Sequence, residues 1–234
     1  MNREKAISNS QASALPLCES LEDRKLLSAT LSGGILTVVG TRHSDSITVS
    51  RGGRGGAFVY VGVDGVSSRF SSRAVRQLSV SGGRGADDIV VSSNIAPVRG
   101  AVVSGGDGND TIQGGGGHEE LLGDAGDDSI LGGDGGDTLL GGLGDDSLTG
   151  GSGDDHIDGQ DGIDHEHGGQ GTDDLVGGAQ DDLNNDDGHD TLTHDANEDN
   201  GGHGSDNVSG DNAGSGKSHD SVLKKSSSTG LFAT

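Results

Sequence analysis

The sequence predicts an all-β protein whose central part is a parallel β-roll, and three observations support this. First, residues Gly105 to Asn185 divide into consecutive nine-residue units with almost no drift in register. Second, each unit starts with glycine and has an acid in sixth place, and most units have an aliphatic residue in eighth place. Third, a chain with 47 glycines, three phenylalanines, one tyrosine and no tryptophan cannot build a conventional core. A solenoid avoids this problem because it adds coils without needing a central core.

Each place in the unit has a physical role. Glycines in the first, second and fourth places permit positive φ angles and close backbone approach, which a sharp reversal needs. The residues after the turn are extended, and two units complete one coil, so successive coils stack as parallel strands in two facing sheets. The aliphatic eighth residues are expected to point inward. They are Ile112, Leu121, Ile130, Leu139, Leu148, Ile157 and Leu175.

The two-unit coil places the acids in two files, one along each edge of the roll. The first file holds Asp110, Asp128, Asp146, Asp164 and Asp182, and the second holds Glu119, Asp137, Asp155 and Asp173. Neighbouring strands lie about 4.8 Å apart. Two like charges at that distance repel by about 1 kcal/mol in water and by more at lower dielectric. We therefore expect a divalent cation between adjacent turns, with glycine carbonyl oxygens as further ligands.

Calcium suits this set of oxygens, because it takes roughly six to eight oxygen ligands in flexible geometry. Zinc fits poorly, since the chain has one cysteine and few regularly placed histidines. Two separate nonapeptides add Asp87 and Asp206 to the candidate ligands. The aliphatic residues are too few to offset the entropy of ordering the chain, so we expect the array to be disordered without calcium and to fold with it.

The motif GGxGxDxUx resembles the hemolysin-type, or RTX, calcium-binding repeat. The resemblance covers residues 105–185, and it is specific because several units follow one another in phase. It implies a secreted protein that stays unfolded in the calcium-poor cytosol and folds outside, at an extracellular or cell-surface location. Glu166 and Asn184 replace the aliphatic eighth residue and Gln180 replaces a turn glycine, so the roll is expected to weaken beyond about Asp158.

Residues 1–29 are expected to form a flexible leader. Within them, Leu21 to Ala29 resembles the LExRxLLSA segment near the N-termini of a family of bacterial extracellular repeat proteins. An amphipathic helical turn is the alternative for this segment.

Residues 30–104 form a β-rich region of short runs separated by glycines, with an Asp64-Gly65 pair typical of a tight hairpin. Degenerate nonapeptides begin at Gly40 and Gly82. The region is therefore either a related solenoid with longer coils or a separate small β-sandwich. Its arginines are either solvated parts of strand faces or a site for an acidic partner.

The β-roll is expected to span residues 105–194, followed by a degenerate repeat and a disordered tail over residues 195–234. No Lys or Arg occurs between Ala101 and Gly216, where most of the acids lie, so nucleic acid is excluded as a partner of this region. We also expect no membrane span, because no apolar run approaches about 18 residues.

Signals for catalysis are weak. Residues 214–218 resemble half of a phosphate-binding loop but lack its first glycine and its flanking strand and helix. His165 and His167 could hold a transition metal, although a decayed repeat explains them more simply. The sequence thus predicts a non-enzymatic, extracellular calcium-binding repeat protein. The alternatives are a surface adhesion module that binds a cell-surface protein or glycan, and the secretion or targeting part of a secreted hydrolase.

Overall fold

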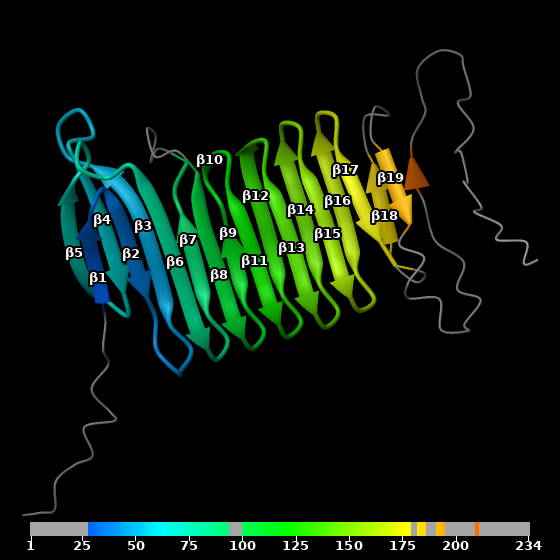
Figure 1. Cartoon of the computed structure of the whole chain (residues 1–234), viewed down its shortest axis with the longest axis horizontal. Coiled ribbons are helices and arrows are strands. Elements are labelled where there is room, and N and C mark those ends of the chain that lie inside the picture. The colour runs from blue at the N-terminus through cyan, green and yellow to red at the C-terminus, as the bar shows by residue number, and fades with distance from the viewer. Residues whose placement is uncertain (1–27, 94–99, 179–181, 186–190, 195–208, 211–234) are drawn as a thin grey trace, which may run out of the picture.

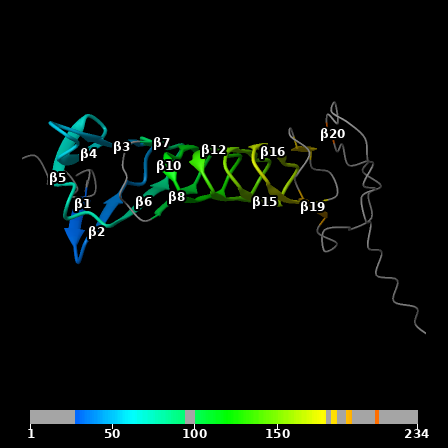
Figure 2. The ribbon, with the colours of Figure 1, turned by 90° about the horizontal axis from the view of Figure 1, so that it is seen from above.

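The computed structural model of the chain describes residues 28–93, 100–178, 182–185, 191–194 and 209–210. In this part of the chain the regular elements are strands, and they form two sheets that face each other along a solenoid (Figures 1 and 2). None of these residues belongs to a helix that could cross a membrane. Most of the predicted leader, most of the LExRxLLSA-like segment, Asp206 and most of the predicted tail lie outside the described residues.

From β2 onward, the first sheet contains one strand from each coil. Its order is β1 (Ser28–Ser32), β2 (Ile35–Val39), β6 (Gln77–Arg84), β8 (Ala101–Asp107), β11 (Glu120–Ala125), β13 (Thr138–Leu143), β15 (His156–Asp161), β17 (Asp174–Gly177) and β19 (Thr191–His194). Apart from the antiparallel pair β1 and β2, neighbouring strands of this sheet run parallel.

The second sheet faces the first and is built in the same way. Its order is β20 (Ser209–Gly210), β18 (Asp182–Asn185), β16 (His165–Gln170), β14 (Ser147–Ser152), β12 (Ser129–Gly135), β9 (Thr111–Gln113), β7 (Asp88–Val91), β3 (Ser46–Gly52), β4 (Phe58–Val63) and β5 (Val66–Ser71), and β10 (Gly116–Gly117) also pairs with β12. The prediction of an all-β parallel roll is confirmed.

The N-terminal strands belong to the same two sheets as the repeats. β2 pairs with β6 and β3 pairs with β7, both in parallel, so this region is a solenoid with longer coils and not a separate sandwich. The extra length is an antiparallel extension, β3–β4–β5, at the end of the second sheet. Asp64 and Gly65 have φ angles of 47° and 79°, as the tight turn between β4 and β5 requires.

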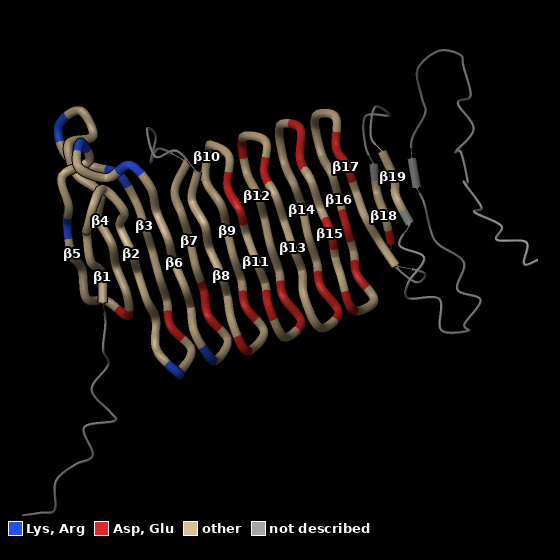
Figure 3. Tube along the Cα trace, viewed as in Figure 1, with Lys and Arg blue, Asp and Glu red and all other residues tan. Residues whose placement is uncertain are grey.

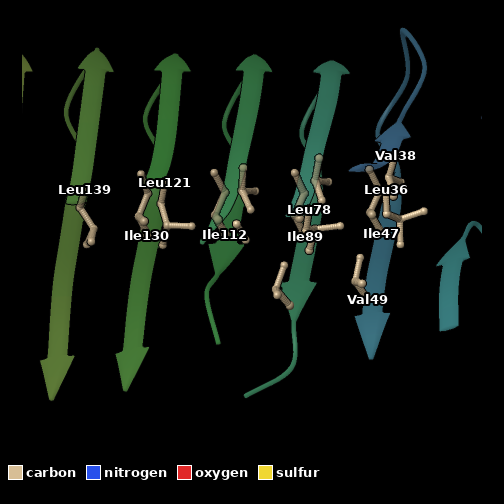
Figure 4. Close-up of a cluster of buried hydrophobic side chains, with 14 of the residues drawn as sticks. Leu36, Val38, Ile47, Val49, Leu78, Ile89, Ile112, Leu121, Ile130 and Leu139 are labelled. Atoms are coloured by element: carbon tan, nitrogen blue, oxygen red, sulfur yellow. The ribbon is translucent and has the colours of Figure 1, made fainter. Parts of the chain in front are cut away.

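The core is a double row of aliphatic side chains between the sheets (Figure 4). All seven predicted eighth-place residues are at most 2% exposed. Leu121 pairs with Leu139 and Leu139 with Ile157, so each coil places its aliphatic residue beside that of the next. This regular contact gives the stack its register, because a slip of one residue would turn the core residues outward.

The register of the repeats shifts by one residue between β16 and β18. Glu166 pairs with Leu183, which is 5% exposed, so Leu183 and not Asn184 occupies the eighth place of this coil. The sequence prediction for this unit was wrong by one residue, because the unit that starts at Gly177 is one residue short. β19 then continues in the shifted register, with Leu192 beside Leu175.

Candidate metal centre

The glycines of each turn serve two different purposes. Most of those in the second and fourth places have positive φ angles, for example 124° at Gly142 and 122° at Gly144. The first place requires glycine for a different reason, which is that the next coil leaves no room for a side chain. A Cβ at Gly141 would lie 2.6 Å from the carbonyl oxygen of Gly159. Backbone of the next coil therefore approaches each turn more closely than any side chain would allow.

The acids in sixth place form the two predicted files, joined by hydrogen bonds that run from coil to coil. The backbone N–H of Asp128 donates to Oδ1 of Asp146 at 2.7 Å, and the N–H of Asp137 donates to Oδ1 of Asp155 at 2.7 Å. The same bond recurs along both files. The further donor and acceptor pairs are Asp87 to Asp110, Asp110 to Asp128, Asp146 to Asp164, Glu119 to Asp137 and Asp155 to Asp173.

The other carboxylate oxygen has a different environment. It is buried and has no hydrogen-bond partner at seven of these acids, which are Asp87, Asp110, Glu119, Asp128, Asp137, Asp146 and Asp155. Buried oxygens are rarely left without a partner, because each loses its hydration without compensation. A row of such atoms in one repeated position therefore points to a ligand.

Carbonyl oxygens lie beside these carboxylate oxygens. A Cβ at Gly132 would lie 2.7 Å from Oδ2 of Asp137 and 2.5 Å from the carbonyl oxygen of Gly150 in the next coil. The same pair of acceptors recurs at Gly123, which lies between Asp128 and the carbonyl oxygen of Gly141. A carboxylate oxygen and a carbonyl oxygen that face the same space are a pair of oxygen ligands that a hard cation can bind.

Burial raises the pKa of these acids. The pKa rises from 3.8 to about 7 at Asp146 and at Asp155, first because of burial and then because of neighbouring acids, while the hydrogen bond from the preceding backbone N–H lowers it. The pKa of Glu119 rises to about 7 for the same first reason, followed by the charge of Asp137. The pKa values of Asp87 and Asp128 rise to about 6. Without a bound cation, the files are unfavourable places for negative charge at neutral pH.

Asp45 ends the first file and was not among the predicted ligands. Its Oδ1 and Oδ2 accept hydrogen bonds from the hydroxyl group of Thr41 at 3.1 and 2.9 Å, and Oδ2 also accepts the Thr41 N–H. Its own N–H donates to Oδ1 of Asp87 at 2.7 Å. The threonine in place of a turn glycine was the sequence signal for this difference. Asp45 therefore closes the file with hydrogen bonds that the other acids lack.

Of the other predicted metal ligands, two belong to the files and one does not. Asp164 and Asp173 continue the two files and are buried. Asp182 does not, because it pairs with His165 in the seventh place, and its carboxylate lies 3.6 Å from the His165 ring. The sixth place of that coil falls at residue 181, outside the described residues. Among the described residues, no three His, Cys, Asp or Glu side chains converge on one point, so backbone oxygens must complete a metal site in the files.

A parallel solenoid with two files of buried acids facing backbone carbonyl oxygens is a cation-binding repeat structure. Within it, residues 101–130 and 131–166 match the model of the RTX calcium-binding nonapeptide repeat (4 copies). This repeat binds Ca²⁺ and is a structural rather than a catalytic unit. No curated protein and no solved structure shows a significant match to the chain.

Proposed function

We propose that the chain is an extracellular, non-enzymatic calcium-binding repeat protein whose roll folds when calcium binds between stacked turns. The observation that carries the proposal is the repeated carboxylate oxygen that is buried without a hydrogen-bond partner and lies beside a glycine carbonyl oxygen of the next coil. The proposed ligands are the acids of the two files and the acid of the earlier repeat. They are Asp110, Asp128, Asp146, Asp164, Glu119, Asp137, Asp155, Asp173 and Asp87.

Calcium would supply positive charge where the files place negative charge at short intervals. Residues 100–178 contain 19 acids and no Lys or Arg, so no Lys or Arg of this segment can neutralise the acids. The buried acids also lack space for hydration. The free energy of calcium binding then stabilises the folded state, because the unfolded chain has no preformed site.

The proposed extracellular location rests on calcium supply and on the RTX match. Extracellular calcium-binding modules work at about 10⁻⁴ to 10⁻³ M calcium. A roll that needs calcium at this level would remain unfolded inside the cell and fold after export. RTX repeat proteins are typically secreted, which supports the same proposal.

The test is a calcium titration of the full chain at about pH 8, followed by far-UV circular dichroism and by calorimetry. We expect a cooperative gain of β-sheet signal in the millimolar range, with several ions bound per chain. Magnesium should produce little of this change, because it requires a tighter octahedral set of ligands. A spectrum that does not change at millimolar calcium, or a magnesium response equal to that of calcium, would refute the proposal.

A further inference from the structure

One strand of the second sheet carries two histidines on its outer face. In the repeats, Asp and Glu mostly gather near the turns along the two edges of the roll (Figure 3), whereas β16 has His165 and His167 in the seventh and ninth places of its unit. Glu166 between them is 1% exposed, so the two histidines point away from the core. Asp164, which comes just before them, is buried in its file. The calcium-binding files therefore do not account for these histidines.

A carboxylate on the next strand orients the first of the two rings. β18 runs parallel to β16 and places Asp182 beside His165. Oδ2 of Asp182 lies 3.6 Å from Nδ1 of His165. An imidazole ring whose Nδ1 faces a carboxylate keeps its N–H on that side, which leaves the lone pair on Nε2. Asp182 therefore favours the form of His165 that can bind a metal ion through Nε2.

The second ring stands at the spacing that a shared ion requires. Residues two apart on a strand lie on the same face, about 6.6 Å from each other. Two imidazole rings on such positions reach one ion between them when they turn toward each other, and rotamers on an outer face change within nanoseconds. On the other side of β16, the neighbours are Ser147 and Thr149 of β14, whose side chains are much smaller than the rings. The pair thus needs no movement of the backbone to close on an ion.

We propose that His165 and His167 bind a divalent transition metal ion of the copper and nickel type, with Asp182 as the residue that positions His165. Imidazole nitrogen is a ligand that these ions prefer, and Cu²⁺ binds most strongly in the series. Two ring nitrogens and two water molecules give the tetragonal set of ligands typical of Cu²⁺ and Ni²⁺. Calcium does not compete for this site, because it takes oxygen ligands. The site goes beyond the proposed calcium-binding function, since its ligands lie on the opposite face of the sheet from the file acids.

The first sheet offers a matched arrangement with one histidine instead of two. His156 of β15 lies beside Asp174 of β17, with Nδ1 and Oδ2 3.2 Å apart. The residue two places further along β15 is Asp158. This arrangement has the oriented ring without the second ring nitrogen, so it should bind copper more weakly than β16 does.

The test titrates Cu²⁺ into the full chain, prepared without a polyhistidine tag and folded in millimolar calcium, and follows calorimetry and electron paramagnetic resonance. The tightest copper site should show two nitrogen ligands in the resonance spectrum. His165→Ala and His167→Ala should each remove one of these nitrogens and weaken this binding at least about tenfold. Asp182→Asn should keep both nitrogens and weaken binding by about tenfold, the loss expected when a residue that orients a metal ligand is removed.

Two variants of the first sheet serve as controls. His156→Ala should keep the two-nitrogen site and its affinity unchanged. Asp158→His should create a second pair of histidines beside Asp174, and so should double the number of copper ions bound in two-nitrogen sites. Circular dichroism shows whether each variant is folded, independently of whether calcium was needed for folding.

The proposal is wrong if the two-nitrogen signal survives in folded His165→Ala and His167→Ala, or if His156→Ala loses it as well. It is also wrong if rising calcium displaces the copper, because the ion would then occupy the files. If the β16 variants fail to fold, Asp158→His decides the matter, and the absence of a second two-nitrogen site would refute the proposal.

Discussion

Replacing Asp146 by asparagine should change the stability of the roll in opposite directions with and without calcium. Asp146 is 1% exposed, and its Oδ1 accepts the N–H of Asp128 at 2.7 Å while its Oδ2 has no hydrogen-bond partner. Asparagine has the same shape and keeps the Oδ1 acceptor. Its amide group can also donate to the carbonyl oxygen of Gly159, which lies beside Oδ2 at Gly141.

The magnitude without calcium follows from the pKa of Asp146, which burial raises from 3.8 to about 7. A carboxyl group with a raised folded-state pKa stabilises the fold below the unfolded-state pKa, and this contribution is lost as the pH rises through the folded-state value. Each pKa unit corresponds to about 1.4 kcal/mol. At about pH 8 the ionised Asp146 therefore destabilises the calcium-free roll by roughly 4 kcal/mol. The neutral Asp146→Asn variant should recover most of that free energy.

With calcium the sign reverses. The amide offers one neutral oxygen where the carboxylate offers charge, so Asp146→Asn should bind calcium at least about tenfold more weakly. The free energy of unfolding should also depend less steeply on calcium concentration, because the variant gains less from binding. A calcium ligand should therefore change stability in opposite directions with and without calcium, whereas a residue that only packs should change it in the same direction in both conditions.

The assay is unfolding at about pH 8 followed by far-UV circular dichroism, once in saturating calcium with urea and once in EDTA with a stabilising osmolyte that lets both proteins fold. Glu120→Gln is the matched control, because Glu120 lies on the exposed face of β11 next to Glu119. Loss of stability in both conditions, or a response equal to that of Glu120→Gln, would refute the assignment of Asp146 as a ligand.

Three further predictions follow from the turns, the core and the acids. Gly144→Ala should destabilise the calcium-bound roll by about 2 to 4 kcal/mol, because its φ is 122° and a Cβ would overlap the Gly126 carbonyl oxygen. Gly65→Ala should cost only about 1 kcal/mol, because Gly65 has a φ of 79° but open space around it. If urea unfolding shows that Gly144→Ala and Gly65→Ala lose the same stability, this account of the turn glycines is wrong. Leu148→Ala should cost about 2 to 5 kcal/mol in the same assay, since Leu148 is fully buried; a loss below 1 kcal/mol would show that this coil is not packed. Finally, β-sheet signal in EDTA should increase as the pH falls from about 8 to 5, because the raised pKa values of the file acids let them protonate in the fold; no gain on acidification would contradict the cost assigned to their burial.

Much of the site was predictable because the repeat encodes it locally. The spacing of Asp128 and Asp146 places both in one file once a coil takes two units. The aliphatic eighth residue fixes which way the strand faces, and glycine marks the turn. Each of these properties depends on residues within one or two coils, so a pattern of nine residues is enough to reveal them.

The missed features are a shift of register between neighbouring coils and a substitution in one turn. The pairing of Glu166 with Leu183 shows a deletion that the fixed nine-residue frame hides, because core packing and not residue counting sets register. Asp45 closes its file only because Thr41 supplies hydrogen bonds where other coils have glycine.

The sequence by itself determined the class of fold, the calcium-binding chemistry and the order of the acids, since these follow from a short repeat. The tertiary structure decided how the N-terminal strands join the same two sheets. It also showed that one carboxylate oxygen accepts a hydrogen bond from the backbone of the preceding coil while the other is buried without a hydrogen-bond partner, at Asp87, Asp110, Asp128, Asp137, Asp146 and Asp155. That division depends on the distance between coils and on burial, which arise only when the turns stack.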